Sequence, residues 1–97
     1  MSAESRPRGA GDPGSLFAAA SSAESSSPDR ADRLYARLSS GAGPWAANAL
    51  FARGRLAHER GLRAAAGRHL RAYLRRFPSG PNAADARRLL TELEGSR

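Results

Sequence analysis

The segment Asn48-Ala-Leu-Phe-Ala-Arg-Gly-Arg-Leu56 returns, with substitutions, 34 residues later as Asn82-Ala-Ala-Asp-Ala-Arg-Arg-Leu-Leu90. The same interval separates Pro44 from Pro78, and Leu16-Phe-Ala18 from Leu50-Phe-Ala52. Periods of about 34 residues are typical of proteins in which helix-turn-helix units stack side by side. The repeat therefore predicts an array of helices.

The residue composition also favours helices. Among its 97 residues the chain has no Val, no Ile and no Cys, and Thr91 is its only β-branched residue. Strands depend on β-branched side chains for packing, whereas Ala, Leu and Arg, which dominate here, are strong helix formers. Without Cys, neither a disulfide nor a thiolate metal site can form. We therefore expect an all-α protein of antiparallel helix-turn-helix repeats.

Capping residues, prolines and glycines divide the chain into a tail and five expected helices. Residues 1–12 are small, polar and rich in Gly and Pro, and we interpret them as a disordered tail because they bury too little apolar surface to offset the entropy of ordering. The repeat domain is expected to cover residues 13–95. Its helices are predicted at 13–26, with fraying at the serine-rich end, and at 28–39, 44–60, 62–77 and 81–94.

Several single residues are expected to shape these helices. Asp12 and Ser27, each followed by a proline, are predicted N-caps. The apolar periodicity places Trp45 and Leu62 toward the core. Gly54 lacks a Cβ and is expected to allow a neighbouring helix to approach closely.

The spacing of small and apolar residues resembles the tetratricopeptide repeat. Its pattern is matched by Leu50-x2-Arg53-Gly54-x2-Ala57, then by Ala66-x3-Leu70, and then by Pro78. Arg53 stands where that family usually has Leu, and Ala57 where it usually has Tyr. The resemblance covers residues 14–94, about two and a half repeats. It implies that the two helices of a unit cross tightly at Gly54 and Ala66.

The same resemblance implies a groove that binds a partner peptide or helix. In this family the first helix of each unit lines the concave surface. The corresponding residues are Asn48, Phe51, Arg55, His58, Asn82 and Asp85. Asn48 and Asn82 occupy equivalent positions, which would suit clamping the backbone of a peptide. The alternative is that each Asn merely helps to start a helix next to its proline.

Two segments of the sequence resemble one branch of the family, that of the bacterial envelope. The segments Gly43-Pro-Trp-Ala-Ala-Asn-Ala-Leu-Phe51 and Tyr73-Leu-Arg-Arg-Phe-Pro-Ser-Gly-Pro-Asn-Ala-Ala-Asp-Ala86 resemble the bacterial Tol–Pal coordinator and outer-membrane assembly lipoprotein families. No apolar segment follows Arg6 and Arg8, so the chain as written is expected to be soluble and cytoplasmic. It would be periplasmic if it were a fragment of an envelope protein.

The formal charge of +7 comes from Arg alone. Eight arginines lie between residues 53 and 76 and face only Glu59, whereas both flanking regions are neutral. Arg68, Arg71 and Arg75 share a helix face that would dock phosphates or an acidic partner. The alternative is a solvated outer face in an Arg-biased chain. This face lacks aromatic side chains on which the bases of a single-stranded nucleic acid could stack.

The sequence contains no constellation that indicates catalysis. His58 and His69 have no further ligands at metal-binding spacing, and the Gly-x-Gly pairs do not lie between a strand and a helix. We therefore expect a non-enzymatic protein-interaction module with no catalytic residue, metal or cofactor. Because stacked repeats generally need about three units for stability, we expect either self-association through Phe17, Trp45 or the C-terminal helix, or an origin of the chain as the tail of a larger protein. The alternative function is binding of nucleic acid or an acidic partner by the arginine-rich hairpin 53–76.

Overall fold

The protein is described by a computed structural model that covers residues 12–95, in which every regular element is a helix. The five helices are α1 (Pro13–Ala23), α2 (Pro28–Ser39), α3 (Gly43–Glu59), α4 (Arg63–Arg76) and α5 (Ala83–Gly95). The all-α prediction is thus confirmed for these residues. The expected disordered tail falls almost wholly on residues 1–11, which lie outside the described part.

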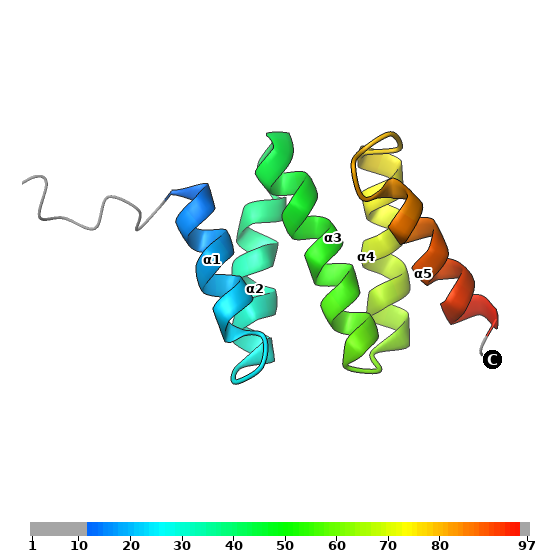
Figure 1. Cartoon of the computed structure of the whole chain (residues 1–97), viewed down its shortest axis with the longest axis horizontal. Helices are drawn as coiled ribbons and strands as arrows, with labels where there is room; N and C mark the ends of the chain where they lie inside the picture. Colours follow the sequence, from blue (N-terminus) through cyan, green and yellow to red (C-terminus); the bar gives the residue numbers. More distant parts are fainter. Residues whose placement is uncertain (1–11, 96–97) are drawn as a thin grey trace, which may run out of the picture.

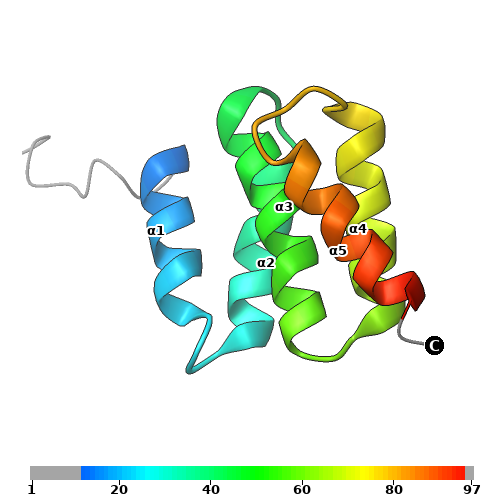
Figure 2. The same cartoon turned by 45° about the vertical axis from the view of Figure 1, so that its right-hand side comes forward.

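The helices form two layers of an antiparallel array (Figures 1 and 2). Consecutive helices pack against each other. In addition, α1 contacts α3 and α3 contacts α5, whereas the backbones of α2 and α4 stay apart. One layer therefore contains α1, α3 and α5, and the other contains α2 and α4. This packing is consistent with a helical repeat.

Local signals explain most helix ends. The Asp12 carboxylate accepts a hydrogen bond from the Ser15 N–H at 3.1 Å, so the expected cap of α1 is confirmed. Ser27 is the N-cap residue of α2, as predicted, but its hydroxyl makes no capping hydrogen bond. Gly61 ends α3 with a φ of 76°, a left-handed conformation that glycine adopts without strain. A turn containing Pro81 delays the start of α5 to Ala83.

Helix α3 belongs to two hydrophobic cores at once. Ala49, Ala52 and Leu56 pack with buried residues of α1 and α2. Leu50 and Ala57, on other sides of the same helix, pack with buried residues of α4 and α5. Because α3 is the shared wall, it couples the N-terminal pair of helices to the C-terminal pair.

The close crossing of α3 and α4 at Gly54 is confirmed. A Cβ built on Gly54 would lie 2.7 Å from Cδ2 and 2.8 Å from Cγ of Leu70, which is fully buried. Ala66 is also fully buried at this crossing. The contact explains why the repeat has small residues at these two positions.

Two apolar residues expected in the core are exposed instead. Trp45 is 42% exposed and Leu62 is 44% exposed. Trp45 lies in the first turn of α3, where its ring rests on Phe17 with centroids 5.5 Å apart. Leu62 precedes α4 and lies outside the helix. Helical periodicity predicted their direction, but within residues 12–95 the neighbouring elements cover them only in part at the ends of the helices.

Arg53 forms an ion pair that joins α3 to α2. Its Nε and Nη2 donate to the two carboxylate oxygens of Asp32 on α2, at 2.7 and 3.3 Å. This bidentate pair holds α2 against α3.

Candidate functional site

The predicted groove residues of α3 do lie on one face of that helix. Asn48, Phe51, Arg55 and His58 follow one another at spacings of three and four and are all partly exposed. Neither core uses this face fully, because Leu50 and Leu56 point to other sides. Arg55 on this face pairs with Glu24 at the end of α1, and His58 lies beside Glu92 of α5. The face is therefore directed between α1 and α5, the two helices on either side of α3 in Figure 2.

An apolar depression of about 400 Å³ opens at the start of this face. The beginning of α3 and the connection between α4 and α5 form its walls. Its lining residues are Gly43, Pro44, Ala47, Asn48, Phe77, Gly80 and Pro81. A pocket with apolar walls and one amide at its edge suits an apolar side chain attached to a polar backbone.

Tyr73 holds the far wall of this depression in place. Its buried hydroxyl accepts a hydrogen bond from the Asn82 N–H at 3.0 Å and touches Gly80. Its ring also packs against Phe51 and Phe77, with centroids 5.9 and 5.5 Å away. The connection between α4 and α5, which forms one wall of the depression, is therefore anchored to the core that α3 shares with α4 and α5.

The amides of Asn48 and Asn82 are available to a partner. Asn48 lines the depression, and Asn82 follows directly after the lining residue Pro81. No hydrogen bond from either side chain is found within residues 12–95, and both side chains remain partly accessible to solvent. Asn48 lies in the second turn of α3, away from the helix start. Asn82 directly precedes α5, and its carbonyl oxygen accepts a hydrogen bond from the Ala86 N–H, so the alternative in which the asparagine helps to start a helix fits the position of Asn82.

Arg55 is engaged within the protein. Its guanidinium pairs with Glu24 at 2.6 Å and Glu59 at 3.0 Å, and Tyr35 also donates its hydroxyl to Glu24. Burial of Glu24 opposes ionisation, but the hydrogen bonds from Arg55 and Tyr35 outweigh it and lower the pKa of the carboxyl. Burial and the Glu24 carboxylate raise the pKa of the Tyr35 hydroxyl. This network fastens the end of α1 to α3.

His58 and Asp85 are also engaged, at the opposite end of the array. His58 Nε2 lies 3.6 Å from Glu92 of α5. Arg88 of α5 reaches both Asp85 and Glu92 at 3.3 Å. Of the six predicted groove residues, Asn48, Phe51 and Asn82 therefore gather around the depression or its wall. Arg55 and Asp85 form ion pairs, and His58 lies beside Glu92.

Replacing Glu24 is expected to reveal the network through the pH dependence of stability. Because the folded protein lowers its pKa, Glu24 stabilises the fold above the pKa it has in the unfolded chain, and this contribution is lost as pH falls through the folded value. Glu24→Gln should lower the free energy of unfolding by about 1–2 kcal/mol at pH 7. The deficit should shrink toward pH 3. Urea unfolding of both proteins at several pH values measures it, and a deficit independent of pH would contradict the assignment.

Residues 12–95 contain no group of three or more His, Cys, Asp or Glu side chains that would hold a metal ion. Burial and the nearby Arg53 lower the pKa of His69, which stabilises its neutral form. His69 belongs to α4 and lies near Asp32 of α2 and Arg53 of α3.

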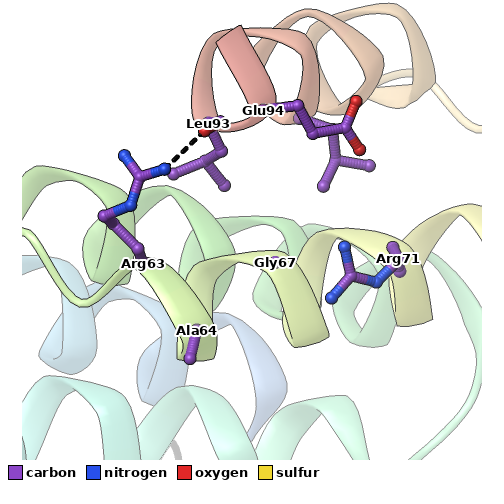
Figure 3. A pocket seen from close by; sticks show the side chains of 7 residues that line it. Arg63, Ala64, Gly67, Arg71, Leu93 and Glu94 are labelled. Atoms are coloured by element: carbon purple, nitrogen blue, oxygen red, sulfur yellow. Dashed lines mark hydrogen bonds between the residues drawn. The ribbon is translucent and has the colours of Figure 1, made fainter. Parts of the chain in front are cut away.

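A second depression, of about 500 Å³, lies between α4 and α5 (Figure 3). Its lining residues are Arg63, Ala64, Gly67, Arg71, Leu90, Leu93 and Glu94. Arg63 donates to the carbonyl oxygen of Leu93 at 2.6 Å and ties the two helices together. Arg71 instead lies along α4, with its Nη2 about 3.0 Å from the Cβ position of Gly67. The helix face that carries Arg68, Arg71 and Arg75 thus reaches the edge of this depression.

Comparison with known proteins adds no identification. No family model, no curated protein and no solved structure matches the chain. None of the helices in residues 12–95 is both long and apolar enough to cross a membrane.

Proposed function

We propose that the protein is a non-enzymatic interaction module of the tetratricopeptide type, which binds a short extended peptide at the depression beside Asn48. The observation that carries this proposal is an apolar depression lined by Asn48, whose amide makes no hydrogen bond within residues 12–95, with Asn82 directly after the lining residue Pro81. A peptide would insert one apolar side chain between Pro44 and Phe77, and the Asn48 and Asn82 amides would bond its backbone. We extend the proposal to a bacterial scaffold or adaptor, because two segments of the sequence resemble the envelope families.

The charges around the site support an internal role for Arg55 and His58. Both side chains join α3 to its neighbours through carboxylates, so they make the binding face rigid and need not contact the peptide. A preorganised site loses less entropy when the ligand binds. We therefore assign specificity to the depression and its two amides.

The test is selection of peptides from a random display library, followed by affinity measurement for the selected sequence. The double variant Asn48→Ala/Asn82→Ala is expected to bind roughly 10-fold to 100-fold more weakly, because each lost hydrogen bond contributes about 0.5–1.5 kcal/mol. Ser22→Ala/Ser25→Ala, two exposed changes near the end of α1, is the matched control and should bind as the wild type does. Equal affinity of the asparagine variant, or a library that yields no binder, would refute the proposal.

A further inference from the structure

Among residues 12–95, the arginines without an internal partner gather on the two helices of one layer. Three lie on α2 and three on α4, and all six are exposed. They are Arg30, Arg33, Arg37, Arg68, Arg71 and Arg75. Within residues 12–95 none of them makes a hydrogen bond or ion pair. We call this set the basic face.

The basic face differs from the arginine-rich hairpin that the sequence singled out. Much of the hairpin's charge is neutralised across helices, by pairing of Arg53 with Asp32, Arg55 with Glu24 and Arg60 with Asp29. Arg76 is also engaged, because it donates to the carbonyl oxygens of Ser39 and Gly41. The unpaired positive charge therefore includes α2, which the count along the sequence had treated as neutral.

Both halves of the basic face point away from the cores. Arg33 and Arg68 each stand two residues after a fully buried alanine, Ala31 or Ala66. Two residues correspond to about 200° around a helix, so each arginine projects to the side opposite the core. Because α2 and α4 form one layer (Figure 1), their outward arginines form one surface, opposite the layer of α1, α3 and α5.

The side chains present on the basic face favour one class of polyanionic partner over the others. The exposed large hydrophobic residues of the described chain are Trp45 and Leu62, and neither belongs to α2 or α4. A protein partner or a lipid bilayer would normally require such apolar anchors. Single-stranded nucleic acid would require aromatic platforms for its bases. The phosphate backbone of a duplex requires neither, and guanidinium groups bind phosphate through paired hydrogen bonds.

We propose that the basic face binds the phosphate backbone of a double-stranded nucleic acid, without reading its sequence. This site is independent of the peptide site, since it uses the other layer of the array. The formal charge of +7 assists the approach of a polyanion. The protein would thereby hold a duplex on one side and a peptide on the other.

The experiment measures binding of labelled 20-base-pair duplexes, one of DNA and one of RNA, by fluorescence anisotropy between 50 and 200 mM salt. If all six arginines contact phosphates, affinity should fall about 1,000-fold over this range. Arg33→Ala/Arg68→Ala should make the slope of log affinity against log salt shallower by about 2. Arg87→Ala/Arg88→Ala removes the same charge from α5 and should leave the slope nearly unchanged. Binding of only the DNA duplex or only the RNA duplex would support the proposal and would identify which nucleic acid the protein binds.

Four results would overturn the proposal. They are a salt slope near zero, equal effects of the two double variants, tighter binding of a single strand than of a duplex, and preferential binding of anionic vesicles. Circular dichroism of each variant checks the fold, which exposed Arg→Ala changes in helices should preserve because Ala is the stronger helix former.

Discussion

Gly54→Ala is expected to destabilise the protein, although alanine normally stabilises a helix interior. The new methyl group would lie 2.7 Å from Cδ2 of Leu70, which is fully buried in the core formed with α4 and α5. Overpacking of this kind costs about 1–3 kcal/mol and exceeds the helix-propensity gain of about 1 kcal/mol. Because the contact of 2.7 Å is very short, we expect the upper part of this cost, about 2–3 kcal/mol, and therefore a net loss of about 1–2 kcal/mol and a drop in the melting temperature of roughly 4–16 °C.

The cause of that loss can be isolated by a double-variant cycle with Leu70→Ala. Leu70→Ala alone should cost about 2–5 kcal/mol because it leaves a cavity. In its background Gly54→Ala should become stabilising, since the clash is gone and the propensity gain remains. Gly67→Ala is the control in a second helix interior, where the added methyl group meets only the flexible end of Arg71. Loss of stability by Gly54→Ala in both backgrounds would contradict a close crossing of α3 and α4.

Tyr73→Phe is expected to weaken both the fold and peptide binding. The hydroxyl of Tyr73 anchors the loop that carries Gly80 and Pro81, and its removal leaves the Asn82 N–H without this acceptor. The expected loss is about 1–3 kcal/mol in the free energy of unfolding. Because the loop forms one wall of the depression, the affinity for the selected peptide should fall as well.

Tyr35→Phe is the matched control for Tyr73→Phe. It removes a hydroxyl that donates to Glu24 near the other end of the array. We expect it to lower stability but to leave peptide affinity unchanged. Equal loss of affinity in both variants would show that binding follows global stability and not the wall of the depression. Urea unfolding and isothermal titration calorimetry provide the two measurements.

The sequence predicted those features that depend on local spacing. The period of 34 residues and the absence of Val and Ile predicted helices, and the small residues at Gly54 and Ala66 predicted where α3 and α4 cross. These predictions succeeded because helical periodicity and Cβ size act over one or two turns. The same reasoning failed for Trp45, since periodicity gives a direction but not the presence of a covering neighbour.

Features that depend on contacts between distant residues could not be predicted in this way. The pairing of Arg53 with Asp32 and of Arg55 with Glu24 joins residues on different elements, so a count of charges along the chain misplaced the unpaired arginines. The depression beside Asn48 likewise requires the α4–α5 loop, which Tyr73 fixes through a hydrogen bond. One signal was available in the sequence: Arg30, Arg33 and Arg37 repeat the spacing of Arg68, Arg71 and Arg75.

The most direct test of the peptide-binding account is a nuclear magnetic resonance titration of the isotope-labelled protein with the selected peptide. The account predicts that the largest shifts of backbone amides occur at Ala47, Asn48 and Gly80, with smaller changes on α2. It also predicts that the Asn48→Ala/Asn82→Ala variant reduces these shifts at equal peptide concentration. Shifts centred on the outer faces of α2 and α4, or spread evenly over all five helices, would contradict the assignment of the site.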